Sequence, residues 1–249
     1  MPHGKNGADF CNWKIYRERH DIFRECHYNS TIMLQNKADG FEAILRTSES
    51  IATELPGVVF IGGVAIYLHT VNNPRHAQKV ESSHDSDFMI SLSDFSALRD
   101  QVEVIYNSRL GKHQAIIGNV EFDVYVERRN NLIVPYDEAF AYSSAYGPLR
   151  VACLEHLFVL KLEAYSDRRG SSKGDKDERD LVRIASISGH VHSPELMLPY
   201  LDSKHLEVLE KLSRGSVFSE MCRGNSHDAK KLRQSFSRFV AEVVSLANR

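Results

Sequence analysis

The chain has 249 residues and a formal net charge of −2, and 26% of its residues are charged. This length suits one large domain or two small ones, and it is enough to bury a substantial core. A net charge so close to zero excludes the basic field by which some proteins bind nucleic acid or membranes over their whole surface. The four cysteines are scattered and form no CxxC pair, so neither a zinc site nor a disulfide framework is expected.

The first twenty residues lack the apolar core of a signal peptide, and no apolar run in the chain reaches the length that spans a bilayer. We therefore expect a cytoplasmic protein without a membrane partner.

Apolar spacing and turn residues predict an α/β (α+β) fold, with a mixed sheet flanked by helices in the first half and only helices in the second. Gly118-Asn119 predicts a two-residue hairpin turn, and Ser93 or Asp94 is expected to cap a helix. The expected strands are 58–61, 85–91, 113–117, 120–126 and 149–153. The expected helices are 38–55, 64–71, 92–101, 154–165, 177–188 and two or three within 190–249. The expected parts of the chain are an N-terminal arm or short helix (1–37), a sheet core (38–150) and a helical domain (151–249).

Two carboxylates stand two positions apart at the start of a predicted strand, in the stretch HDSDF. In a strand, Asp85 and Asp87 point to the same face about 7 Å apart, and they repel each other unless a cation lies between them. Mg²⁺ prefers such oxygen ligands, and Asp123 on the polar side of a later strand is a candidate third ligand. The alternative is a solvated strand end, which is the commoner meaning of an isolated DxD.

Gly62-Gly63 lies between a buried strand and a helix. Glycine lets the backbone approach a phosphate closely, and a helix N-terminus offers N–H groups to an anion. The alternative is an ordinary strand-to-helix turn. Because neither GxGxxG nor GxxxxGK[ST] is present, a phosphate site here would belong to neither of those classes.

The order of strand, Gly-Gly, helix, DxD strand and a later strand with a single Asp resembles the nucleotidyltransferase superfamily related to DNA polymerase β. The matching stretches are FIGGVAIYL, HDSDFMI and VEFDVYV. The resemblance implies that Gly62 and Gly63 hold the triphosphate of an incoming nucleotide and that Asp85 and Asp87 ligate the metal. It also implies that Asp123 ligates one metal ion and helps to deprotonate the attacking hydroxyl group.

The second half resembles the AbiEii-type toxin branch of nucleotidyltransferases, which pairs an LxxLKxxA helix with an arginine and a KDxxD segment. The matching residues are Lys161, Arg168 or Arg169, Lys176, Asp177 and Asp180. By this resemblance these residues bind nucleotide, and Lys161 also takes part in catalysis. Taken singly, Lys161 could be a lysine whose stem lies along an amphipathic helix, and KDERD could be a solvated charge run. The resemblance covers residues 58 to 184.

These resemblances imply an enzyme that moves a nucleoside monophosphate from an NTP such as ATP to an acceptor hydroxyl group. Two Mg²⁺ ions are the expected cofactors, with Mn²⁺ as an alternative. RNA such as tRNA is the favoured acceptor, and a toxin with an antitoxin protein partner is the implied biological setting. The alternatives are a small-molecule or protein acceptor, or a non-catalytic protein of the same fold that binds nucleotide or a partner. The basic stretch at 229–239 could face RNA phosphates or only solvent.

Overall fold

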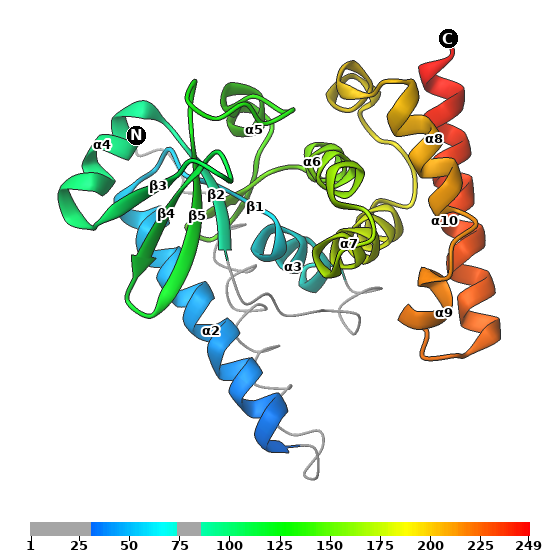
Figure 1. The fold of residues 1–249 in the computed structure, drawn as a ribbon, viewed down its shortest axis with the longest axis horizontal. Helices are drawn as coiled ribbons and strands as arrows, with labels where there is room; N and C mark the ends of the chain where they lie inside the picture. The colour runs from blue at the N-terminus through cyan, green and yellow to red at the C-terminus, as the bar shows by residue number, and fades with distance from the viewer. Residues whose placement is uncertain (1–30, 74–85) are drawn as a thin grey trace, which may run out of the picture. The chain divides into compact units, whose positions relative to one another are not determined.

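The computed structural model describes residues 31–73 and 86–249, and Figure 1 shows how their elements are arranged. The chain divides into two compact units, each described by itself below. Unit 1 contains the described residues up to Asn130 together with Phe140–Ala152, and unit 2 contains Asn131–Ala139 and Cys153–Arg249. Among the described residues, no helix combines the length and the apolar character that crossing a membrane requires.

Unit 1 is built on a seven-stranded mixed sheet with the spatial order β3-β4-β5-β2-β1-β7-β6. β2 is parallel to β5 and β1 is parallel to β7, whereas the other neighbouring strands pair antiparallel. The expected α/β class, with a mixed sheet and a helical C-terminal part, is confirmed. The strands are β1 (Val59–Ile61), β2 (Ser86–Ile90), β3 (Val104–Asn107), β4 (Lys112–Ile117), β5 (Val120–Val126), β6 (Ser144–Tyr146) and β7 (Leu149–Val151).

One face of the central strands is apolar because side chains alternate across a strand. Phe60, Phe88 and Phe122 come from β1, β2 and β5, and all three are fully buried. Their ring centroids follow one another at 5.7 Å from strand to strand. Burial of three aromatic side chains in a row fixes the register of these strands, and this register places Asp87 and Asp123 on the opposite face.

Helices cover the sheet of unit 1. α2 packs against β5 and β7, and α3 packs against β1 and β2. The rings of Phe41 and Tyr67 join α2 to α3 with centroids 4.6 Å apart. The helices of this region are α2 (Thr31–Glu54), α3 (Gly63–Val71), α4 (Leu92–Gln101) and α5 (Tyr136–Ala141), the last of which crosses from unit 2 into unit 1.

Unit 2 consists of helices packed on aromatic residues. Phe158 meets Phe239 at 5.1 Å between centroids, and Phe218 meets Phe236 at 5.7 Å. These contacts pack α10 against α6 and α9. The helices are α6 (Leu154–Arg168), α7 (Ser172–Ser188), α8 (Ser203–Leu212), α9 (Val217–Met221) and α10 (Ser226–Ala247), with short 3₁₀ turns η2 (Pro194–Leu196) and η3 (Leu198–Tyr200).

Two local expectations were wrong. The cap of α4 is Ser91, whose side chain accepts a hydrogen bond from the Asp94 backbone N–H, so neither Ser93 nor Asp94 has this role. The Asp94 carboxylate instead accepts a hydrogen bond from the Gly57 N–H at 2.6 Å. α7 begins at Ser172, five residues earlier than expected, in a stretch whose charged residues and glycine had indicated a loop.

Candidate active site

Two carboxylates lie side by side on the polar face of the unit 1 sheet. Asp87 on β2 and Asp123 on β5 are direct partners in the parallel register. Neighbouring strands are about 4.8 Å apart, so two side chains in register project together from the same face. Asp123 is buried, with 7% of its surface exposed. The predicted pairing of these two residues is thus present, whereas Asp85 lies outside the described residues.

Gly62 places the N-terminus of α3 beside the Asp87 carboxylate. Ile61 is the register partner of Asp87, so Gly62 follows directly beside that carboxylate. The φ angle of Gly62 is 72°, and a Cβ atom at this position would clash with Asp87 Oδ2 and lie 3.2 Å from its carboxyl carbon. The Gly62 carbonyl then accepts the helical hydrogen bond from the Ile66 N–H at 3.1 Å. Only glycine therefore allows this close approach between the start of α3 and the Asp87 carboxylate.

Replacement of Gly62 by alanine is expected to lower the free energy of unfolding by about 2–4 kcal/mol, because backbone strain and crowding against Asp87 add together. Gly118→Ala is the matched control: its φ angle is also positive, at 61°, but a Cβ atom there meets nothing within 4 Å. This control should lose only about 1 kcal/mol. Urea unfolding of the two variants measures the difference, and equal losses would contradict crowding at the Asp87 carboxylate.

Lys112 is a part of this face that the sequence analysis missed. Its ammonium group forms an ion pair with Asp123 Oδ2, and the exposed fractions of the two side chains are only 11% and 9%. Gln114 lies on the same face, where its Nε2 donates to Asp123 Oδ1 at 3.4 Å and to Glu121 at 2.8 Å. The signal for Lys112 was available, since the Gly118-Asn119 hairpin sets Gln114 opposite Asp123 and Lys112 is two residues further along the same face.

Lys112→Met is expected to lower the free energy of unfolding by about 3–5 kcal/mol, because it leaves the Asp123 carboxylate buried without its cation. The double variant Lys112→Met/Asp123→Asn should recover much of this loss, since it removes the stranded charge. Chemical denaturation of both variants measures the coupling. A single-variant loss below about 1 kcal/mol would mean that the ion pair contributes no more than an exposed one.

The donors on this face fit a hard divalent cation. Mg²⁺ is usually held by one or two carboxylates, with water and phosphate oxygens completing its shell. Asp87 and Asp123 supply two carboxylates in register, and Gly62 keeps side-chain atoms away from one of them. Within 31–73 and 86–249, no group of three or more His, Cys, Asp or Glu residues gathers in a way that could hold a metal ion. Two of the three predicted ligands, Asp87 and Asp123, lie within the described residues as register partners.

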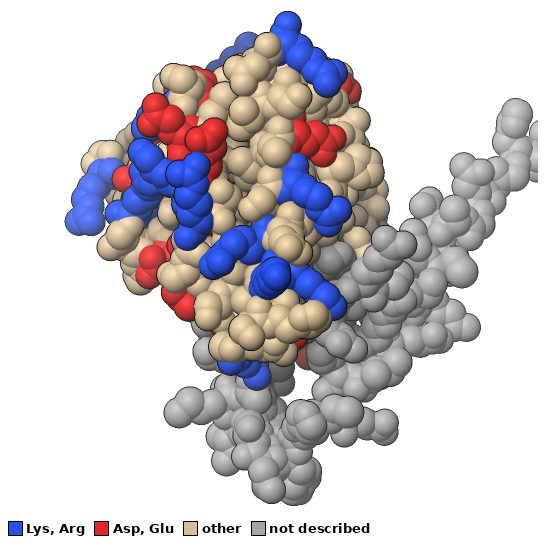
Figure 2. Space-filling view, turned by 90° about the vertical axis from the view of Figure 1, so that its right-hand side faces the viewer, with Lys and Arg blue, Asp and Glu red and all other residues tan. Residues whose placement is uncertain are grey.

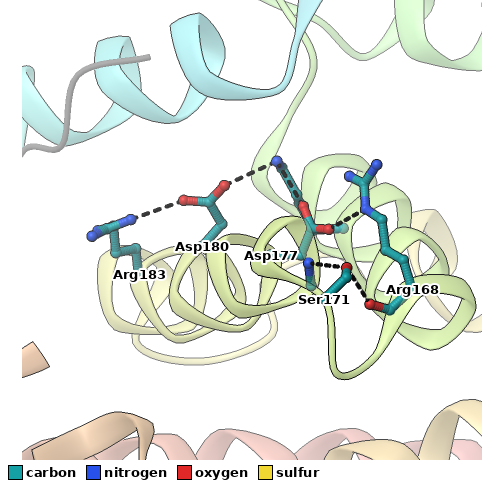
Figure 3. A network of polar contacts seen from close by, with 7 residues as sticks. Arg168, Ser171, Asp177, Asp180 and Arg183 are labelled. Carbon is teal, nitrogen blue, oxygen red and sulfur yellow. Dashed lines mark hydrogen bonds and ion pairs between the residues drawn. The ribbon is translucent and has the colours of Figure 1, made fainter. Parts of the chain in front are cut away.

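A second polar cluster joins α6 to α7 in unit 2 and contains four of the residues that the sequence predicts to bind nucleotide (Figure 3). Asp177, with 1% of its side chain exposed, accepts from Arg168 Nε at 2.6 Å and from Lys161 Nζ at 3.2 Å. Asp180 is paired with Lys161 at 2.9 Å and with Arg183 at 2.9 Å. We call Lys161, Arg168, Asp177, Asp180 and Arg183 the α6–α7 network.

The turn between α6 and α7 explains why this network forms. The Ser171 side chain donates to the Arg168 carbonyl at 2.7 Å and accepts from the Gly174 N–H at 3.1 Å, so it closes α6 and caps α7 (Figure 3). A Cβ atom on Gly174 would clash with the Arg168 carbonyl oxygen. The stretch RRGSSKG is therefore a tight helix–helix connection, which directs the first turns of α7 onto the last turns of α6.

Each predicted site residue can now be placed within its own unit. Gly62, Asp87 and Asp123 come together in unit 1, and Gly63 is the first residue of α3. The α6–α7 network gathers Lys161, Arg168, Asp177 and Asp180 in unit 2. The remaining predicted residue, Lys176, is half-buried on α7.

No family model matches the chain, and no curated protein matches it either. Solved structures similar to it include an antigenic nucleotidyltransferase-like protein from Paracoccidioides brasiliensis (13% identity, TM-score 0.46, covering 79% of this chain and 93% of that one). Another is JHP933 from Helicobacter pylori (13% identity, TM-score 0.49, covering 88% of this chain and 96% of that one). A third is the Megavirus polyadenylate synthase (9% identity, TM-score 0.42). The match covers 84% of this chain but only 46% of that one, so this chain spans less than half of its length. Such low identities and TM-scores do not carry over a substrate or a reaction, so the functional argument rests on the residues described above.

Proposed function

We propose that the chain is a Mg²⁺-dependent nucleotidyltransferase that transfers a nucleoside monophosphate from an NTP to an acceptor hydroxyl group. The observation that carries this proposal is the convergence of Asp87, Asp123 and Gly62 on one face of the unit 1 sheet. Two carboxylates beside the N-terminus of a helix provide metal ligands and backbone N–H donors at adjacent positions. A nucleoside triphosphate needs both, because its phosphates bind a divalent cation and accept hydrogen bonds.

In the proposed reaction, the acceptor oxygen forms a bond to the α-phosphorus while the bond from that phosphorus to the pyrophosphate breaks. Bound Mg²⁺ would neutralise charge on the phosphates and lower the pKa of the attacking hydroxyl group. Asp87 and Asp123 would hold the cation, and Asp123 would receive the hydroxyl proton. Gly62 and Gly63 direct the first N–H groups of α3 to the leaving phosphates.

Lys112 has a positioning role in this proposal. Its ammonium group is bound to Oδ2 of Asp123, which fixes the rotamer of that carboxylate and directs the other oxygen, Oδ1, along the polar face with Gln114. A carboxylate whose orientation is set before binding loses less conformational entropy when it takes up a ligand.

The α6–α7 network has a structural role in this proposal. Lys161, Arg168 and Arg183 share the carboxylates of Asp177 and Asp180, so the network joins the two helices through buried acceptors. Arg168 pairs with Asp177 through Nε, and Lys161 is shared between Asp177 and Asp180. The nucleotide-binding role of these two residues, and of Lys176, Asp177 and Asp180, therefore stays a prediction.

RNA is the acceptor that we favour, and a toxin role with an antitoxin partner remains the prediction drawn from the resemblance in the second half of the chain. A small molecule or a protein hydroxyl group is the alternative outcome of an acceptor screen. All of these acceptors demand the same chemistry from Asp87 and Asp123, so the metal site can be tested before the acceptor is known.

Thermal unfolding in the presence of Mg²⁺ and a non-hydrolysable NTP analogue tests the site directly. Ligands that bind the native state raise its stability according to their concentration and affinity. The wild-type chain should gain stability when both ligands are present and much less with either alone, and Asp87→Ala should remove the joint gain. A gain that survives in Asp87→Ala would place nucleotide binding elsewhere, and a gain without transfer to any acceptor would indicate a non-catalytic nucleotide-binding protein.

A further inference from the structure

Positive charge is concentrated at the C-terminal end of the chain. Residues 211–249 contain eight Lys and Arg residues but only three Asp and Glu residues, a net charge of +5 in a chain whose total is −2. Figure 2 shows one face of the molecule, on which several Lys and Arg side chains lie exposed among Asp and Glu side chains. Such an uneven distribution creates a local positive potential although the whole protein is nearly neutral.

α10 turns three of these cations outward. Its buried residues, among them Phe236 and Phe239, form one face of the helix. Lys230, Lys231 and Arg238 lie on the opposite face and are exposed. We call these three residues the α10 basic face.

The charges of the α10 basic face are available to a ligand. In the described part of the chain, Lys230, Lys231 and Arg238 are exposed, and their side chains take part in no ion pair or hydrogen bond. Arg233 differs, because it donates to the Gly215 carbonyl at 3.1 Å and its guanidinium lies 5.3 Å from the centroid of the Phe218 ring. Arg233 thus contributes to the packing of unit 2, whereas the three residues of the α10 basic face do not.

The spacing of the three cations suits a chain of phosphates. Arg238 lies seven and eight residues after Lys231 and Lys230, which is two helical turns or about 11 Å along the axis. Lys231 and Arg238 lie nearly in line along the helix and Lys230 lies beside Lys231, so the three cations are spread over an extended surface. Spread cations can contact several phosphate groups of a nucleic-acid backbone, whereas a single bound anion would need them to converge on one point.

Two other kinds of partner fit less well. A protein partner usually buries aromatic or apolar anchors, but the exposed large apolar residues of the described chain all lie between Ile105 and Tyr142, and none lies on α8, α9 or α10. A membrane-surface helix inserts an apolar face into the lipid, and the apolar face of α10 is buried in unit 2. The phosphate groups of a nucleic-acid backbone suit a surface that offers positive charge without exposed large apolar side chains.

We propose that the α10 basic face binds the phosphate backbone of RNA. This inference rests on the proposed function in one respect, namely that the bound RNA also supplies the acceptor hydroxyl group. The binding of RNA itself does not depend on the chemistry at Asp87 and Asp123, so the two can fail separately.

The test compares the variant Lys230→Gln/Lys231→Gln/Arg238→Gln with a control of equal charge change, Lys173→Gln/Lys204→Gln/Lys211→Gln. The control removes three exposed lysines of unit 2 that lie outside α10. Binding of total tRNA to each full-length protein is measured by fluorescence anisotropy over a series of salt concentrations. Loss of three phosphate contacts should weaken binding at least about tenfold and reduce the slope of log K against log salt by about 2–3, while the control stays near the wild type.

Equal effects of the two triple variants would overturn the inference, because only general charge would then matter. Tighter binding to anionic lipid vesicles than to tRNA, or equal binding to DNA of matched length, would overturn it as well.

Transfer of label from an NTP is measured on the same proteins. If the wild type labels no acceptor but its tRNA binding depends on the α10 basic face, the proposed function fails and the binding surface stands. If the wild type labels RNA and the α10 variant binds and labels RNA equally well, the surface fails and the proposed function stands.

Discussion

Asp87→Asn is expected to lower the rate of nucleotide transfer on the order of 10³-fold, the scale of losing one electrostatic group that stabilises a transition state. Asparagine keeps the shape of the side chain but removes the negative charge that holds a divalent cation. Single-turnover transfer with saturating NTP and Mg²⁺ measures the effect on the chemical step. Circular dichroism should show that the fold is retained.

Glu121→Gln is the matched control for this prediction. Glu121 lies on the same face of β5 as Asp123, two residues before it, but it is exposed and bonded to Gln114. The same change from carboxylate to amide should therefore leave the transfer rate within a few-fold of the wild type. Equal losses in the two variants would show that general charge on this face, and not the Asp87 carboxylate, supports the reaction.

Asp177→Ala is expected to lower the free energy of unfolding by about 3–5 kcal/mol, because it removes the buried acceptor that joins Lys161 to Arg168. Lys161 would keep its pair with Asp180, but Arg168 would lose its pair with Asp177. Urea denaturation measures the loss. Asp175→Ala is the control, since Asp175 is exposed in the first turn of the same helix and should cost less than about 1 kcal/mol.

The same pair of variants separates the two roles considered for the α6–α7 network. If the network is structural, Asp177→Ala loses stability without any ligand present. If Asp177 only binds nucleotide, the unliganded protein should unfold like the wild type, and the variant should lose only the stability gained from Mg²⁺ and NTP. The second result would contradict the structural role that we propose.

Much of the site in unit 1 was predictable because it depends on short-range rules. Alternation along β5 separates Phe122 from Asp123, and a two-residue turn at Gly118-Asn119 sets the register of the hairpin. The position of Gly62 at the end of a buried strand predicts a close backbone approach. That the approach is to Asp87, however, depends on the antiparallel pairing of β1 with β2, which no local pattern contains.

The missed features depend on contacts between residues distant in the sequence or on elements with weak patterns. Lys112 is the first residue of β4, a strand with no clear apolar alternation, so its buried pair with Asp123 was missed although the hairpin register could have indicated it. Two of the four residues of β3 are exposed and they are neighbours, so buried and exposed side chains do not alternate along this strand. The early start of α7 comes from the Ser171 cap and from the contact of Gly174 with the Arg168 carbonyl, whereas the charged residues between them indicated a loop.

Transfer from NTPs labelled at either the α- or the γ-phosphate tests the proposed reaction most directly. Wild-type protein with Mg²⁺ is offered total tRNA, a small-molecule pool or no acceptor other than itself, with Asp87→Asn as the inactive reference. A nucleotidyltransferase should attach the α-label to an acceptor, release the γ-label as pyrophosphate, and do neither in Asp87→Asn. Attachment of the γ-label would show phosphoryl transfer, and the absence of any label that depends on Asp87 would contradict the proposed function.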